Sequence, residues 1–360
     1  MWLRTGVVVL VVAGCGPATV APPVSTTTPT ADAHAPLVAV LDAPFGAVPN
    51  SVHLVALDGT EVASMAIRPD AEAIAVAGSE VLIAGGGRLD AVDRTGADIE
   101  LGAIPDDTSA DLVRGLVASP DGSQWLWASL RVMADGAIRS RIYLDDDGAG
   151  PRLVLEHTEQ GHSLQPVAWT AAGPVLSDEV DGIGGYVLFR RSFGAASHLD
   201  LATGALTQLT SDTCAFNDLA PGGMVTCVVD SREGPNDGGV VRLTVRTANG
   251  TAIVVPLGTD VHQAGDALFQ PQGPLITIAS SPATGAGTDA VHTAFVDSRG
   301  GAMQPVVFNG LQPVQWISTS SLLLTRGLNI SGGPPGTYVG NLEGTATKVS
   351  PHPYALGIVR

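Results

Sequence analysis

The stretch Leu116–Gly122 (LVASPDG) runs almost directly into Trp125–Trp127 (WLW). An apolar segment, a turn built on Pro-Asp-Gly and a second apolar segment are typical of two antiparallel strands joined by a tight turn. The pattern returns at Val167–Trp169 before a turn at Ala171–Gly173, and again further along the chain. This recurrence of hairpins predicts an all-β fold.

A second kind of hairpin recurs between these, with a polar turn that ends in glycine. Glycine is the residue that the left-handed position of such a turn favours. The flanking residues alternate between apolar and polar, as Val241, Leu243 and Val245 do with the residues between them. The turns are Asp58-Gly59, Thr95-Gly96, Asp147-Gly148, Thr203-Gly204, Asn249-Gly250, Arg299-Gly300 and Glu343-Gly344.

The two hairpins together form a unit that repeats along the chain. Apolar residues mark it at intervals of 51, 50, 50 and 47 residues, at Ala118, Trp169, Leu219, Phe269 and Trp316. A repeat of this length with four strands is typical of a propeller blade. The 324 residues after position 36 divide into seven such units of about 46 residues. We therefore predict a seven-bladed β-propeller of four-stranded antiparallel blades, with six or eight blades as open alternatives.

The first unit lacks its innermost strand. It supplies strands only at Leu37–Leu41, Val52–Leu57 and Glu61–Ala66, whereas Tyr354–Val359 follows the last unit as a surplus strand. Pairing of this C-terminal strand into the first blade would close the ring and remove exposed sheet edges.

Two segments resemble the repeat of TolB-type propellers, which are similar to WD-repeat propellers. They are Ser119–Gly122 with the aromatic strand after it, and His198–Gly204 leading to Gln208–Thr210. The resemblance implies a propeller fold. Propellers of this broad family bind proteins, peptides or sugars and some are enzymes, so the resemblance implies no single activity.

The N-terminus resembles a bacterial lipoprotein signal. Arg4 precedes the short apolar run Gly6–Ala13, and Val12–Cys15 ends it with small residues before a cysteine. The resemblance implies that residues 1–15 are a signal peptide and that lipidated Cys15 holds the chain on a membrane outside the cytoplasm, at the outer membrane or cell surface. The alternative is a cytoplasmic chain in which Cys15 is a buried thiol.

The domain organisation follows from composition. Residues 16–36 are rich in Pro and Thr and are predicted to form an extended linker before a propeller domain at 37–360. Hydrophobic residues make up 45% of the chain and charged residues 15%, which permits a large core. The 44 glycines and 25 prolines leave little room for helices of ordinary length.

The net charge of −17 argues against nucleic acid as a partner and against electrostatic docking on anionic lipid. Nucleic acid and anionic lipid both favour clustered Lys and Arg, but the chain has 35 acidic and 18 basic residues. We interpret the acidic excess as charge that keeps an exported protein soluble.

Two cysteines remain after Cys15. Cys214 and Cys227 flank a predicted turn at Ala220–Gly223 and are candidates for a disulfide in an oxidising compartment. Two free buried thiols are the alternative.

Long connections are expected to gather on one face, because successive turns of an up-and-down sheet alternate faces. They are Arg131–Ala137, Asp181–Ala196, Ser231–Gly239, Ser281–Asp289 and Gly327–Gly336. Loops on a rigid scaffold commonly bind ligands. The candidate binding face comprises Asp106, Asp107, His157, His162, Arg190, Arg191, Asp260 and His262, with Asp266 nearby.

No nucleophile, metal-ligand or nucleotide-binding motif is recognised in the sequence, so no catalytic residue, metal or cofactor is predicted. The sequence favours a lipid-anchored propeller that binds an envelope protein or extracellular ligand. The alternative is a propeller enzyme, a lyase or hydrolase of polysaccharide or peptide, with histidines and acids near the axis.

Overall fold

The computed structural model describes residues 35–360 apart from 45, 48, 106–110, 147, 171, 181–188, 190–193, 212, 230–240, 248–249, 283–289 and 306–307. The chain divides into two units, Met1–Ala33 and His34–Arg360, and all described residues lie in the second. The described residues form strands, turns and bends, and none of them belongs to a helix that could cross a membrane.

The two ends of the second unit meet in one antiparallel sheet. Its order is β28-β1-β2-β3, with β28 at Tyr354–Val359, β1 at Leu37–Leu41, β2 at Ser51–Ala56 and β3 at Glu61–Ala66. Strand β28 pairs with β1 from Leu37↔Val359 to Leu41↔Tyr354. The predicted pairing of the C-terminal strand with the first unit is confirmed.

Four further sheets have four antiparallel strands each. The first comprises β4 (Ala73–Ala77), β5 (Glu80–Gly85), β6 (Arg88–Val92) and β7 (Asp98–Ala103). The second comprises β16 (Ala215–Leu219), β17 (Val225–Val229), β18 (Arg242–Arg246) and β19 (Ala252–Pro256). The third comprises β20 (Gln263–Gly265), β21 (Leu275–Ser281), β22 (His292–Asp297) and β23 (Phe308–Asn309). The fourth comprises β24 (Gln312–Trp316), β25 (Ser321–Arg326), β26 (Gly336–Asn341) and β27 (Ala346–Ser350).

The remaining sheet has eight strands in sequence order. They are β8 (Asp111–Ala118), β9 (Gln124–Val132), β10 (Ala137–Asp146), β11 (Arg152–Gln160), β12 (His162–Thr170), β13 (Gly173–Val180), β14 (Ala196–Leu199) and β15 (Leu206–Gln208). Its two halves join between β11 and β12, where a single residue pair, Glu159 and His162, is in register. Gly161 makes the turn between them with a φ of 68°.

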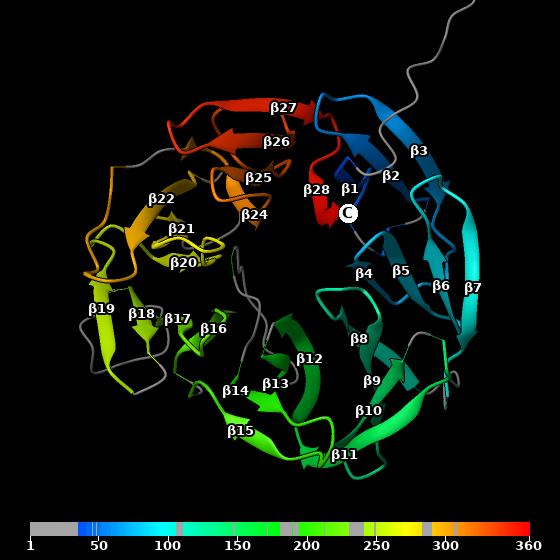
Figure 1. Ribbon diagram of the computed structural model, residues 1–360. Helices are drawn as coiled ribbons and strands as arrows, with labels where there is room; N and C mark the ends of the chain where they lie inside the picture. Colours follow the sequence, from blue (N-terminus) through cyan, green and yellow to red (C-terminus); the bar gives the residue numbers. More distant parts are fainter. Residues whose placement is uncertain are drawn as a thin grey trace, which may run out of the picture. The chain divides into compact units, whose positions relative to one another are not determined.

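The sheets of this unit follow one another around a common centre, with β4, β8, β12, β16, β20, β24 and β28 innermost (Figure 1). Apolar clusters fill the space between consecutive sheets. Leu126 and Leu144 of β9 and β10 pack with Leu176 of β13. Val38 and Ile358 pack with Leu323 of the β24–β27 sheet, so the last sheet is joined to the first.

Glycine turns connect strands as predicted, with one correction. Gly59, Gly96, Gly204 and Gly344 all have positive φ. The turn after β22 instead places Gly301, not Gly300, in the left-handed region, with a φ of 70°. The Gly301 N–H donates to the carbonyl of Asp297 at 2.8 Å, a span of four residues as in the Gly204 turn, so the left-handed position falls on the second glycine.

One predicted long loop is short. Strands β9 and β10 extend towards each other, and the Gly136 N–H donates to Met133 O at 3.0 Å across a tight turn. The predicted loop Arg131–Ala137 is therefore wrong in its length, because register pairing of β9 and β10 continues to Val132↔Ile138.

Candidate functional site

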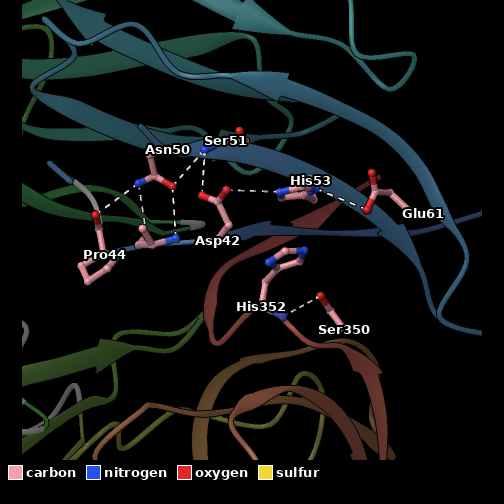
Figure 2. Close-up of polar contacts among 9 residues, drawn as sticks. Asp42, Pro44, Asn50, Ser51, His53, Glu61, Ser350 and His352 are labelled. Atoms are coloured by element: carbon pink, nitrogen blue, oxygen red, sulfur yellow. Dashed lines mark hydrogen bonds and ion pairs between the residues drawn. The ribbon is translucent and has the colours of Figure 1, made fainter. Parts of the chain in front are cut away.

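Two histidines stack on each other where the β24–β27 sheet meets the β28–β1–β2–β3 sheet. His53 belongs to β2, and His352 belongs to the connection from β27 to β28. Their ring centroids are 4.0 Å apart and the ring planes differ by 13°. The chain thus brings together residues almost three hundred positions apart (Figure 2).

Strand alternation directs His53 into this junction. Val52 and Leu54 pack in an apolar cluster on one side of β2. His53 and Val55 lie on the other side of the strand, towards the β24–β27 sheet. The His53 side chain is 14% exposed. Within the described part of the chain, neither buried ring nitrogen has a hydrogen-bond partner.

Two carboxylates lie beside the His53 ring (Figure 2). Nδ1 is 3.3 Å from Oε2 of Glu61 on β3, and Nε2 is 3.9 Å from Oδ2 of Asp42. The Glu61 contact meets the distance of an ion pair without the geometry of a hydrogen bond. Each ring nitrogen of His53 therefore faces a different acid.

A hydrogen-bond network holds Asp42 in place at the end of β1. Its Oδ1 accepts a bond from the Ser51 N–H at 2.9 Å. The buried Asn50 side chain accepts from the Ala43 N–H at 3.2 Å and donates to Pro44 O at 3.2 Å. These bonds close the connection from β1 to β2 around the acid.

The backbone of His352 is restrained as well. Pro351 and Pro353 flank it and restrict the local dihedrals. The His352 N–H donates to Ser350 Oγ at 3.1 Å, and Thr337 Oγ1 donates to the His352 carbonyl at 2.7 Å. Burial lowers the pKa of His352, and the neighbouring His53 lowers it further, while Asp42 and Glu61 oppose the shift. The neutral imidazole is favoured.

This cluster has the composition of a metal-binding group. One ligand atom each from His53, Glu61 and His352 lies within 4.8 Å of the other two. It is the one group of three or more such side chains found among the described residues. Two imidazoles and a carboxylate are ligands that first-row divalent metals accept.

A cavity of about 620 Å³ lies at the centre of the unit, lined by residues of all the innermost strands except β20. Four of the five recurring apolar positions of the sequence line it: Ala118, Trp169, Phe269 and Trp316. The fifth, Leu219, is buried against Phe216 and Val225.

A second cavity of about 510 Å³ is lined by the beginning of β4, by Gly115–Val117 in the second half of β8 and by Gln165–Val167 in the middle of β12. Glu72, Gln165 and Glu179 provide its polar lining, beside Ile74, Leu116 and Val167. The innermost strands begin where the chain arrives from the preceding sheet. Of the lining residues, Glu72 just before β4 and Glu179 near the end of β13 lie towards the side on which the sheet-to-sheet connections are predicted.

Several residues of the predicted binding face lie outside the described residues: Asp106, Asp107, Arg190 and Arg191. The lipid-attachment residue Cys15 also lies outside them.

The placement of His157 in a connection is wrong. His157 lies within β11, because that strand stays paired with β10 as far as Ala137↔Gln160. Its Nε2 is 3.0 Å from Glu159 Oε2 at the surface. His162 begins β12, and its Nδ1 is 3.1 Å from Asp178 Oδ1.

Asp260 and His262 occupy the predicted connection between β19 and β20. Asp260 is exposed, and the His262 N–H donates to the Ser281 carbonyl at 2.9 Å. Asp266 follows β20 with a φ of 50°, which is uncommon for a residue other than glycine.

The predicted disulfide between Cys214 and Cys227 is present, with the two Cα atoms 5.3 Å apart. Both cysteines are buried; Cys214 immediately precedes β16 and Cys227 lies within β17. The bond ties the innermost strand of this sheet to its neighbour.

No protein-family model matches the chain, and no curated protein matches it. Several solved structures match it. Uncomplexed acylaminoacyl peptidase from Pyrococcus horikoshii aligns with a TM-score of 0.51 and 11% identity over 87% of this chain and 52% of that chain. This chain thus spans about half the length of that peptidase.

Two further structures are more distant. The Pan2 WD40 domain of Neurospora crassa has a TM-score of 0.45 and 13% identity over 78% of this chain and 83% of that chain. The β-propeller domain of the Trilobed protease from Pyrococcus furiosus has a TM-score of 0.43 and 12% identity over 87% and 83%. At these identities the likeness concerns the fold alone, which is that of a β-propeller domain.

Sequence reasoning missed the cluster of His53, Glu61 and His352. The predicted pairing of Tyr354–Val359 with Leu37–Leu41 could have indicated this cluster. It sets Tyr354 opposite Leu41, so His352 must lie close to Asp42 and the start of the next strand.

Proposed function

We propose that this chain is a membrane-anchored, extracytoplasmic β-propeller that binds a protein or other extracellular ligand on its loop-bearing face. The observation that carries the proposal is the cavity lined by Glu72, Gln165 and Glu179, of which Glu72 and Glu179 lie towards the side on which the sheet-to-sheet connections are predicted. Binding sites in rigid scaffolds commonly lie in such concave places beside variable loops.

The propeller is proposed to have seven blades. The eight-stranded sheet would count as two blades, β8–β11 and β12–β15, because one residue pair joins its halves. Those two and the other five sheets make seven units of four strands, in agreement with the interval of about 46 residues.

The anchor is proposed to be acyl chains on Cys15. The apolar run Gly6–Ala13 before the cysteine and the Pro- and Thr-rich segment 16–36 after it support this proposal. The test is the Cys15→Ala variant expressed in a bacterium that processes lipoproteins. The wild-type chain should partition into detergent and carry an acylated cysteine at its mature N-terminus, as measured by mass spectrometry. Equal partitioning of Cys15→Ala would disprove the anchor.

The binding face is tested by photocrosslinking. A benzophenone amino acid replaces Asp260, which is exposed on a sheet-to-sheet connection, and in a matched variant it replaces Glu343, which is exposed on a turn at the opposite edge. A discrete crosslinked partner in native membranes is expected from position 260 only. The same partner from both positions, or from 343 alone, would place binding elsewhere.

A further inference from the structure

We propose that His53, Glu61 and His352 form a binding site for a borderline divalent cation of the zinc class, which latches the closure of the propeller. The site goes beyond the ligand-binding function proposed above and does not depend on it. Its three ligands come from β2, from β3 and from the connection between β27 and β28.

The state of His53 is the first argument. Both of its ring nitrogens are buried without a hydrogen-bond partner among the described residues, which is costly for a polar group. A cation bound at Nδ1 would give that nitrogen a partner, and Glu61 Oε2 is already 3.3 Å away on the same side. Ligand atoms of a tetrahedral zinc site are roughly 3.3 Å apart, given bonds of about 2.0–2.1 Å.

The second argument is the role of Asp42. Metal-bound histidines usually donate their other ring N–H to a carboxylate. Asp42 Oδ2 lies 3.9 Å from His53 Nε2, on the opposite side of the ring from Glu61. A small side-chain rotation would complete this pair, and Asp42 is a positioning residue in the proposed site.

The third argument is the restraint on His352. Pro351 and Pro353 flank it, and Ser350 and Thr337 hold its backbone, so little backbone freedom is lost when the imidazole binds. All three ligand atoms lie within 4.8 Å of one another. Because the two rings are stacked with only 13° between their planes, at least one imidazole has to rotate for both to bind the same cation.

The consequence for the fold follows from where the ligands lie. A cation held by β2, β3 and the β27–β28 connection would link the first and last segments of the domain. Because the ligands are assembled only in the closed ring, binding would stabilise the folded state by mass action. The cation is thus expected to be structural.

The test is titration of the purified full-length chain, stripped with a chelator, with Zn²⁺ by calorimetry, together with thermal unfolding and the visible spectrum of added Co²⁺. We expect one Zn²⁺ per chain, a raised unfolding midpoint, and Co²⁺ bands of low-symmetry nitrogen and oxygen coordination. Glu61→Gln should weaken Zn²⁺ affinity at least tenfold and remove the midpoint shift. Glu61 is 49% exposed, so this variant should fold.

The control is His157→Gln, which removes a histidine beside a glutamate at the surface without touching the cluster. It should bind Zn²⁺ as the wild type does. His352→Gln should behave as Glu61→Gln does. The proposal is overturned if the wild-type chain does not bind Zn²⁺, if Glu61→Gln binds it equally well, or if His157→Gln removes the binding.

Discussion

At the scale of single residues, short polar side chains hold the turns between strands. Asp121 is the clearest case: its Oδ1 accepts bonds from Ser119 Oγ at 2.6 Å and from Ser123 N at 3.1 Å. The Ser119 hydroxyl, followed by Ser123, lowers the pKa of Asp121 to about 2. The turn in LVASPDG is therefore stabilised by an ionised carboxylate, not only by proline and glycine.

This predicts a pH dependence for the Asp121 turn. Because the pKa of Asp121 is lower in the folded state than in the unfolded chain, its contribution to stability is complete above the ordinary value of 3.8 and is lost as pH falls towards 2. Asp121→Asn keeps an acceptor but cannot titrate. Denaturant unfolding at a series of pH values should show a shallower loss of stability between pH 4 and 2 for this variant. Parallel curves for variant and wild type would refute the assignment.

The disulfide gives a second prediction at this scale. Reduction of Cys214–Cys227 releases a loop closed over 13 positions and should lower the free energy of unfolding by about 3 kcal/mol. Denaturant titrations with and without reductant measure this difference. A Cys214→Ala, Cys227→Ala variant is the control, since its stability should not respond to reductant; a response there would mean that the reductant acts elsewhere.

At the scale of elements, the ring depends on β28. Ile358 is 3% exposed and packs with Val38, Val40 and Leu323, which belong to the first and last sheets. The strand therefore contributes hydrogen bonds to β1 and apolar contacts to two sheets at once. Its loss would expose the edge of β1.

Ile358→Ala should accordingly lower the free energy of unfolding by about 2 to 5 kcal/mol, the range for buried large-to-small changes. Chemical denaturation measures it. Leu328→Ala serves as the matched control, because Leu328 is 66% exposed and should change stability by less than about 0.5 kcal/mol. Similar small effects for both variants would show that β28 does not latch the ring.

At the scale of the whole molecule, the net charge of −17 opposes compaction. Some acids are neutralised locally: Arg68 Nε lies 2.8 Å from Asp90 Oδ2, in an ion pair that is largely buried. Because the chain has 35 acidic and 18 basic residues, its carboxylates nonetheless repel one another, and dissolved salt screens this repulsion.

Raising NaCl from about 10 mM to about 150 mM shortens the Debye length from roughly 30 Å to 8 Å. The thermal unfolding midpoint should therefore rise, because repulsion among acids weakens more than the short, buried Arg68–Asp90 pair does. Calorimetry in the two buffers tests this, with an equal ionic strength of KCl as control. A falling midpoint would mean that favourable ion pairs dominate.

The sequence by itself predicted an all-β fold and the pairing of the last strand with the first unit. Alternation, glycine turns and the interval between Ala118, Trp169, Phe269 and Trp316 are local signals, and the structure places these four residues around one cavity. Alternation was less informative for middle strands. Ile142 and Tyr143 are adjacent in β10 and lie on opposite faces of the strand, yet both are buried, because each face packs in a different apolar cluster.

Only the tertiary structure decided which polar residues meet. His53 and His352 carry no shared motif, and nothing near either one in the chain contains a ligand spacing. They stack because β28 enters the first sheet in a register that sets Tyr354 against Leu41. Strand formation depends on neighbours along the chain, whereas a site built across the closure depends on the register and packing of segments from opposite ends of the domain.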